Sequence, residues 1–325
     1  MRILFFLLLA CLPAPSFAWC FFGHQLINRL AVYCLPREMV SFYKFHINYI
    51  TENSVNPDKR RYAVEGEAPR HYIDVDIYDK FYNDSAVYKM PRTWHEAVSR
   101  FTEDTLMAYG IVPWHVVRMK AQLTEAFKQR NVARILRLSA EIGHYIADAN
   151  VPLHTTENYN GQLTGQEGIH AFWESRVVEL FGENYDMFVG AASYEYKVAH
   201  RAWQAVRQAN AALDSVLRFE KELTHRVRPE QKFVLEDRNG VIMKTYSREF
   251  STQYHQMLNH QVERQMRASV KMVGDFWFTC WVDAGQPNLA ELANFKLDAA
   301  IQKEENEEKV GWLKRLFQVR TESDN

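Results

Sequence analysis

The spacing of apolar residues along the chain predicts a protein built almost entirely of helices. From His24, apolar residues recur at helical intervals until Pro36 ends the pattern. The same periodicity continues through most of the remaining chain. It predicts further helices over residues 37–49, 91–108, 112–128, 132–149, 191–223, 248–283 and 288–304.

Two segments depart from this pattern. Residues 56–76 have no helical period and contain Pro57, Gly66 and Pro69, so we expect an irregular surface connector of the kind that often carries site residues. Residues 232–247 contain two β-prone runs around an Asn-Gly pair, which predicts a two-stranded hairpin. The expected fold class is therefore all-α, a single multi-helix domain with one small β-hairpin excursion near 232–247.

The first residues resemble an export signal. Arg2 is followed by a short apolar run and by Ser16-Phe17-Ala18, a small-x-small cleavage site. Cleavage between Ala18 and Trp19 would give a secreted or periplasmic protein, although the run ending at Cys11 also resembles a lipoprotein processing site. No other run reaches membrane-spanning length. We therefore expect a signal peptide over 1–18 and the main domain over 19–301.

Residues 302–325 form a charged, amphipathic tail. Trp312, Leu313, Leu316 and Phe317 lie beside basic residues there, so the tail could touch a membrane. Docking of the tail on its own domain is the favoured alternative.

Composition narrows the class of protein. Of 325 residues 47% are hydrophobic, which is enough to bury a large core. The formal net charge is −1, so no basic excess would drive nonspecific duplex binding. Cys20, Cys34 and Cys280 remain after the signal; they allow one disulfide with one leftover thiol, or three buried thiols, and the sequence does not choose.

The stretch 144–174 concentrates residues that could bind a metal ion. His144 and Asp148 are four residues apart, as are His170 and Glu174, so each pair leaves one face of a helix. His154 follows just after the break at Pro152. One such pair is usually a solvated ion pair, but three elements in succession favour zinc, which prefers imidazole and carboxylate ligands.

Further ligands would have to come from earlier in the chain. A newly exposed α-amine at Trp19 could chelate a metal together with its own carbonyl oxygen, five residues before His24. The connector offers Asp58 and His71, with Arg61 three residues after Asp58. Taken alone, each of these residues has an ordinary explanation, such as a turn or a helix start.

Together these residues resemble the ligand set of the S1/P1 nuclease and zinc-dependent phospholipase C superfamily. The resemblance runs from Trp19 to Glu174, about half the chain, and all nine ligands occur in the family's order. The ligands are Trp19, His24, Asp58, His71, His144, Asp148, His154, His170 and Glu174.

The resemblance implies an all-α fold with three zinc ions. One ion would be bound by Asp58, His71, His144 and Asp148. A neighbouring ion would be bound by Trp19, His24 and the bridging Asp148. A third would be bound by His154, His170 and Glu174. The implied chemistry is zinc-assisted attack of water on phosphorus, with Asp58 and Asp148 holding the metals and Arg61 neutralising phosphoryl charge.

The branch of the superfamily is less clear. The short spacing from Trp19 to His24, and Arg61, resemble the nucleases, as does the Tyr72 and Asp74 pair that would stack on and hydrogen-bond a base. Glu174 and the short loop from His154 to His170 resemble the phospholipases instead. Ser175 stands where some nucleases carry Asn.

The leading hypothesis is a zinc-dependent nuclease that cleaves single-stranded DNA or RNA to 5′-nucleotides and that also has possible 3′-nucleotidase activity. The first alternative is a phospholipase C acting on phospholipid headgroups. The second is a non-enzymatic protein with structural zinc. The expected partners are nucleic acid, nucleotides or phospholipid as substrates, and no stable protein partner is inferred.

Overall fold

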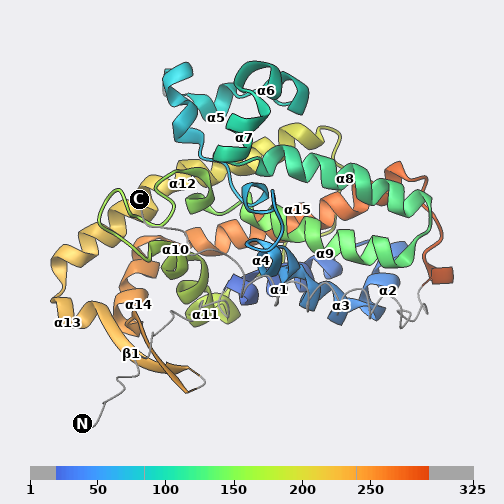
Figure 1. Ribbon diagram of the computed structural model, residues 1–325. Helices are drawn as coiled ribbons and strands as arrows, with labels where there is room; N and C mark the ends of the chain where they lie inside the picture. Colours follow the sequence, from blue (N-terminus) through green and yellow to red (C-terminus); the bar gives the residue numbers. More distant parts are fainter. Residues whose placement is uncertain (1–19, 84, 239, 293–325) are drawn as a thin grey trace, which may run out of the picture.

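Helix α9 (Val132–Asp148) lies at the centre of a helical body, and the other elements are arranged around it. The protein is described by a computed structural model that places residues 20–83, 85–238 and 240–292 (Figure 1). In these residues regular structure is helical apart from one hairpin, so the all-α prediction is confirmed. The predicted signal peptide, Trp19 and the tail from 302 lie outside the described residues.

The helices before α9 cover its lower side in Figure 1 and form a separate upper group. Helices α5, α6 and α7 make the upper group, above α8 and α12. The elements are α1 (Cys20–Ala31), α2 (Arg37–Phe45), α3 (Ile47–Glu52), α4 (Asn56–Arg60), α5 (Ala86–Lys89), α6 (Trp94–Phe101), α7 (Glu103–Tyr109) and α8 (Val112–Lys128), with 3-10 turns η1 (Val32–Cys34), η2 (Asn53–Val55), η3 (Ala68–Arg70) and η4 (Val75–Phe81).

After α9 the chain makes short turns and then two long helices. The loop that follows α9 leads into α10, and the π-helical turn η6 lies between α10 and α11. The elements are η5 (Pro152–Thr155), α10 (Ile169–Ala171), η6 (Phe172–Arg176), α11 (Val177–Phe181), η7 (Gly182–Asn184), α12 (Val198–Arg226), α13 (Pro229–Lys232), β1 (Phe233–Arg238), β2 (Val241–Tyr246), α14 (Arg248–Met257), α15 (Gln261–Asp283) and η8 (Ala290–Leu292).

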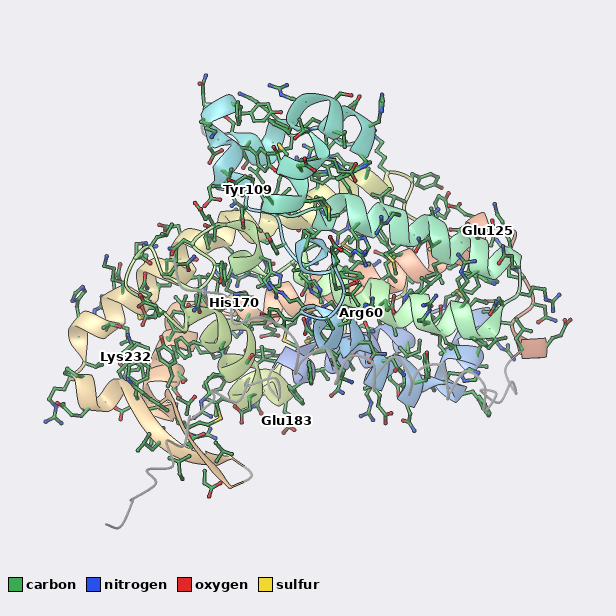
Figure 2. The ribbon with its side chains drawn as sticks, in the orientation of Figure 1. Arg60, Tyr109, Glu125, His170, Glu183 and Lys232 are labelled. Carbon is green, nitrogen blue, oxygen red and sulfur yellow. The ribbon has the colours of Figure 1, made fainter. Side chains whose placement is uncertain are left out.

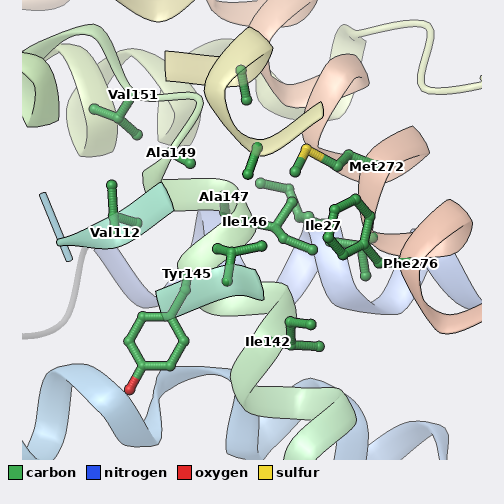
Figure 3. Packing of buried hydrophobic residues seen from close by; sticks show 14 of the residues in the cluster. Ile27, Val112, Ile142, Tyr145, Ile146, Ala147, Ala149, Val151, Met272 and Phe276 are labelled. Carbon is green, nitrogen blue, oxygen red and sulfur yellow. The ribbon is translucent and has the colours of Figure 1, made fainter. Parts of the chain in front are cut away.

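The core forms around α9 because apolar side chains fill most of its second half, between the polar Glu141, His144 and Asp148. Ile142, Tyr145 and Ile146 are fully buried. Figure 3 shows Ile146 on the side of Ile27 of α1 and Phe276 of α15, while the ring of Tyr145 points away from them. Burial of such side chains contributes roughly 1.5–3 kcal/mol each. Within the described residues, none of the helices is both long and apolar enough to cross a membrane.

The β1–β2 hairpin confirms the prediction over 232–247. Its strands pair antiparallel from Phe233 with Tyr246 to Arg238 with Val241. The hairpin projects from the lower left of the body in Figure 1. Glu236 accepts hydrogen bonds from Arg176, which ties the hairpin to η6.

Several predicted helices are interrupted. The helix predicted over 37–49 breaks at His46, and the one over 91–108 breaks at Thr102, which has φ 68° and caps α7 through its hydroxyl. The helix predicted over 248–283 breaks at Asn259 and His260, both with positive φ. Helical periodicity continues across each break, so the pattern of apolar residues did not reveal them.

Two other predictions need correction. Helix α12 starts at Val198, not at residue 191, because the preceding residues cross α15 and bond to it: Ser193 N–H donates to Asp275 Oδ1 at 2.7 Å. The connector over 56–76 lies at the surface only in part, because Tyr62 and Val64 in it are exposed and other residues are buried. It contains short helical turns, and Glu67 and His71 in it are fully buried.

Candidate metal centre

Eight of the nine predicted ligand residues lie within the described part of the chain, and the fold brings all eight to one place. Three groups of donor atoms, each within 4.8 Å of one another, are formed there. The ninth residue, Trp19, lies outside the described residues. His24 comes from α1, Asp58 from α4, His71 from just after η3, His144 and Asp148 from α9, His154 from η5, His170 from α10 and Glu174 from η6.

Close packing of α1 on α9 brings His24 and His144 together. Asn28 donates from Nδ2 to the carbonyl of Ala140 at 2.9 Å. A Cβ on Gly143 would lie only 1.9 Å from Asn28 Oδ1, so this approach requires glycine. One turn away on each helix, the rings of His24 and His144 stack with centroids 3.9 Å apart.

The connector is fixed against η5 by two reciprocal hydrogen bonds. The backbone N–H of Ile73 donates to the carbonyl of His154 at 2.9 Å, and His154 Nδ1 lies 2.6 Å from the carbonyl of His71. The second contact requires the proton of His154 on Nδ1. Its Nε2 is therefore left with a lone pair, as a metal ligand needs.

We call Asp58, His71, His144 and Asp148 the inner group. His71 Nδ1 lies 3.0 Å from both His144 Nε2 and Asp148 Oδ2, and 3.6 Å from Asp58 Oδ1. His144 Nε2 lies 3.2 Å from Asp148 Oδ2 and 3.5 Å from Asp58 Oδ1. The four donors thus surround one point, and His71, His144 and Asp148 are almost completely buried.

We call His154, His170 and Glu174 the outer group. His154 Nε2 lies 3.1 Å from His170 Nε2 and 3.6 Å from Glu174 Oε2, and His170 Nε2 lies 2.8 Å from the same oxygen. His170 Nδ1 is 3.2 Å from the carbonyl of Tyr159, so its Nε2 also faces the group with a lone pair. Figure 2 shows His170 near the centre of the molecule in this view.

These distances fit zinc. A zinc–nitrogen bond of about 2.0–2.1 Å in tetrahedral geometry separates neighbouring donors by roughly 3.3 Å. The separations between donor atoms span 3.0–3.6 Å in the inner group and 2.8–3.6 Å in the outer group. Imidazole nitrogens that approach one another this closely without a shared proton are poorly satisfied by the protein alone. A cation between them satisfies both.

Asp148 connects the inner group to His24. Its Oδ2 faces His71 and His144, while Oδ1 lies 3.4 Å from His24 Nε2 and 3.7 Å from His154 Nδ1. Burial, followed by the proximity of His144, lowers the pKa of His24 to about 4, so its ring is neutral and can bind a metal at neutral pH. This arrangement suits a carboxylate that bridges two ions.

The charges of the cluster also call for a cation. Burial favours neutral His144, but Asp148 and Asp58 outweigh that effect and raise its pKa to about 10. Burial likewise opposes ionisation of Glu174, yet His154 and the neighbouring imidazole hold its pKa well below the usual value. Protons on the histidines thus neutralise buried carboxylates, and a divalent metal would replace those protons.

No protein-family model matches the chain, and no curated protein does either. Among solved structures, the alpha-toxin of Clostridium perfringens, isolated from an avian strain, resembles it. The two chains are 11% identical with a TM-score of 0.46, and the match covers 81% of this chain and 64% of the toxin chain. This chain therefore spans less than two thirds of that toxin. A likeness at this level assigns no function, so the conclusions below rest on the side chains.

The predicted catalytic arginine, Arg61, lies beside the inner group. Burial works against its charge, but Tyr62, Asp58 and Asp148 raise its pKa. Its Nε is buried and has no hydrogen-bond partner within residues 20–83, 85–238 and 240–292. A cationic donor is thus held next to the cluster with hydrogen-bonding capacity to spare.

The predicted substrate-binding pair lies on the side of His154. Tyr72 is partly buried, and its hydroxyl donates to the carbonyl of Ala108 at 3.4 Å. Asp74 is only 9% exposed, and burial, followed by Asp76 and Glu157, raises the pKa of its carboxyl to about 7. A carboxyl group whose pKa is raised in this way, beside a candidate metal centre, is typical of a functional residue.

Sequence reasoning missed the residues that support the inner group. Glu67 is fully buried and lies 3.7 Å, from Oε1, from His71 Nε2. It is bound by Arg60 at 3.1 Å, by Arg70 at 2.7 Å and by the hydroxyl of Tyr145. A carboxylate behind a metal-ligating histidine fixes the ring. The Glu67-x-x-x-His71 spacing is one further four-residue pair, and it could have pointed to this role.

Proposed function

We propose that this protein is a zinc-dependent phosphodiester hydrolase of the S1/P1 nuclease type. The observation that carries the proposal is the inner group, in which Asp148 also faces His24, together with the adjacent three-donor outer group. Two or three neighbouring ions held in this way are used to hydrolyse phosphate esters. When bound, zinc would supply Lewis-acid stabilisation and a water that is acidic near neutral pH.

The chain's own residues would do the rest. Asp58, His71, His144 and Asp148 would hold the inner ion, and the outer group would leave at least one position open, because it offers three protein donors. Arg61, with its unpartnered Nε, would donate to phosphoryl oxygens as negative charge develops. No separate protein base is needed in this scheme.

Single-stranded nucleic acid is the proposed substrate class. Tyr72 would stack on a base, and Asp74, two residues later, would hydrogen-bond the base edge, as the resemblance to the nucleases implies. The test is a panel of single-stranded DNA, RNA and 3′-AMP, each with and without zinc. Absence of zinc-dependent turnover of all three would contradict the nuclease proposal.

A phospholipase C is the second candidate, favoured by Glu174 and by the short loop between His154 and His170. Phosphatidylcholine vesicles separate the two candidates. Release of a phosphorylated headgroup, without cleavage of nucleotides, would replace the nuclease by the phospholipase. If neither substrate class is hydrolysed while zinc binds, the third reading, a structural zinc site, would stand.

We further propose that export and catalysis are linked through Trp19. His24 Nε2 has two carboxylates nearby, Asp148 at 3.4 Å and Glu174 at 3.7 Å, and an ion beside it would need additional donors. A free α-amine at Trp19, created by cleavage after Ala18 in a secreted or periplasmic protein, would supply one. A chain with Met before Trp19 should bind about one zinc fewer, since an amide nitrogen is a poor ligand. Full zinc content in that chain would contradict the assignment.

A further inference from the structure

Two adjoining cavities lie away from the candidate metal centre. One, of about 540 Å³, is lined by arginines and glutamates between the connector, α8 and α9. The other, of about 680 Å³, lies where α6 and α7 meet α8, and apolar side chains such as Trp94, Met107 and Trp114 line it. Figure 1 shows α7 directly above the start of α8. We call them the arginine cavity and the tryptophan cavity.

The two cavities share three residues. Arg70, His115 and Arg118 line both, so the cavities meet at these side chains. Glu67 and Tyr145 form the wall of the arginine cavity that faces the inner group, because Tyr145 donates to Glu67 and Glu67 lies beside His71. The joined space is therefore separate from the metal centre.

The donors at the junction favour an anion. Arg118 Nη2 lies 3.0 Å from His115 Nδ1. A guanidinium only donates, so His115 Nδ1 accepts and the ring proton is on Nε2. That Nε2 is buried and has no hydrogen-bond partner among the residues that the structure describes, although His115 is only 3% exposed. The junction therefore carries hydrogen-bond donors without a matching acceptor, and an oxyanion bound at Arg118 would supply acceptors.

The arginine cavity also has more positive than negative side chains. Arg60 is paired with Glu67 and Glu141, and Arg70 with Glu67. Arg118 and Arg137 have no ion pair with any carboxylate in the described part of the chain, although both line this cavity. Two guanidinium groups without a carboxylate partner therefore line the arginine cavity, and Arg118 is the one in contact with His115. Guanidinium groups bind phosphate-type oxyanions through paired hydrogen bonds.

The tryptophan cavity supplies the opposite chemistry. Its wall includes Trp114, which is 5% exposed and stacks edge-on against Trp94 at 5.9 Å. Cavities of 300–1,000 Å³ with mostly apolar walls and a few polar groups at one end are typical ligand sites. Here the Arg118–His115 junction is one polar end, and Glu65, Arg92, Thr93 and Glu103 also line the cavity.

We propose that the joined cavities bind a single-chain amphiphile, with a phosphate-like head at Arg118 and His115 and an apolar tail beside Trp94 and Trp114. The site is distinct from the metal centre, and the proposal holds whether or not the protein is a phosphodiesterase. The probes are decylphosphonate, which has both parts and no hydrolysable ester, and methylphosphonate, which has the head alone. Decanol provides the tail alone.

The test is calorimetric titration of the zinc-loaded protein with each probe below its micelle concentration. We expect decylphosphonate to bind at least tenfold more tightly than methylphosphonate. Any binding of the head at the zinc cluster is common to both phosphonates, so the difference between them reports the tail. Decanol alone should bind weakly, because it lacks the head.

Three variants locate the binding. Arg118→Gln should weaken decylphosphonate binding about tenfold, the loss expected for one charge-assisted hydrogen bond. Ala199→Phe, which fills the tryptophan cavity from α12, should bring decylphosphonate down to the affinity of methylphosphonate. Arg134→Gln removes one charge from α9 outside both cavities and should change nothing. All three should keep the zinc content of the parent.

Each other result overturns the proposal. Equal affinities for the two phosphonates in the parent would leave no site for a tail. Unchanged decylphosphonate binding in both Arg118→Gln and Ala199→Phe would place the amphiphile elsewhere. Equal losses in Arg118→Gln and Arg134→Gln would reduce the effect to net charge.

Discussion

The inner and outer groups differ in how much of a metal's surroundings the chain supplies. The inner group has four donors, and His71, His144 and Asp148 in it are at most 1% exposed. The outer group has three donors, and the side chain of His170 is 19% exposed. A closed four-donor site holds its ion, whereas a three-donor site leaves room for water or substrate. The comparison assigns retention of metal to the inner group and contact with substrate to the outer group.

The two groups also differ in what stands behind them. His71 of the inner group is backed by the buried Glu67, which is fixed by Arg60 and Arg70. The histidines of the outer group are oriented by backbone carbonyls: the carbonyl of His71 orients His154, and the carbonyl of Tyr159 orients His170. The inner group thus depends on a network of charges that mutation can break, and the outer group on backbone positions that mutation of side chains leaves in place.

The largest expected effect is that of Asp148→Asn, because Asp148 contacts His71 and His144 of the inner group and also His24. The amide keeps the shape but removes the negative charge and places N–H groups against imidazoles. We expect loss of two or more zinc ions and a fall in phosphodiesterase activity of more than about a thousandfold, since each metal contributes several kcal/mol. Metal analysis and initial rates measure both.

The matched control is Asp275→Asn. Asp275, on α15, is also buried, at 7% exposure. It accepts hydrogen bonds from Ser193 and from Lys271, away from the cluster. Its zinc content should equal that of the parent. If Asp148→Asn also keeps its zinc and its activity, Asp148 does not bind the ions assigned to the inner group and to His24.

Glu174→Gln should separate the outer group from the inner group. It removes one of three donors of the outer group, and the inner group keeps all four of its own. The expected result is loss of about one zinc per chain and roughly a hundredfold lower activity. Loss of all zinc in this variant would show that the groups do not fill independently.

Glu67→Gln tests the support behind the inner group. The change leaves the ligands intact but weakens the carboxylate contact with His71 and leaves Arg60 and Arg70 less well paired. Outer-shell changes of this kind cost about 10–100-fold in metal affinity or activity. Glu141→Gln is the control, because Glu141 also pairs with Arg60 at 2.6 Å but does not face His71. Equal zinc affinities in the two variants would show that Glu67 does not support zinc binding through His71.

The smallest expected effect on the metals is that of Asp74→Asn, at the substrate side. Burial raises the pKa of Asp74 from 3.8 to about 7, so the folded state binds its proton more tightly than the unfolded state. This carboxyl therefore lowers stability progressively as the pH rises from about 4 to about 7. The loss is no more than about 4 kcal/mol, from 1.36 kcal/mol per pKa unit.

The measurement is the free energy of unfolding of both zinc-free proteins between pH 4 and pH 8. Relative to the parent, Asp74→Asn should gain stability across that range and then level off. Parallel profiles would show that Asp74 ionises normally in the folded protein.

The sequence predicted the site better than it predicted the details of the fold. Spacing of four residues was enough to pair His144 with Asp148 and His170 with Glu174, because both pairs lie on helical turns. The hairpin was found because Asn-Gly is a strong local turn signal. In both cases local chemistry determined the structure.

The errors in the predicted fold arose where contacts between distant residues determine the structure. The positive φ of Thr102 and of His260 interrupts helices whose apolar pattern continues unchanged. Burial of the polar connector depends on Arg60 and Arg70 pairing with Glu67, partners that become visible once the chain is folded. Cys34 and Cys280 are free and buried, so they form no disulfide with each other. The side chain of Cys20 lies outside the described residues.

The central claim is that the inner and outer groups bind zinc at neighbouring positions. Its most direct test is the number of zinc ions per chain in the purified, exported protein, measured by mass spectrometry of the intact folded protein. The account predicts close to three, with about one lost in Glu174→Gln. A parent protein that binds no zinc, or that carries the same number of ions as Glu174→Gln, would contradict it.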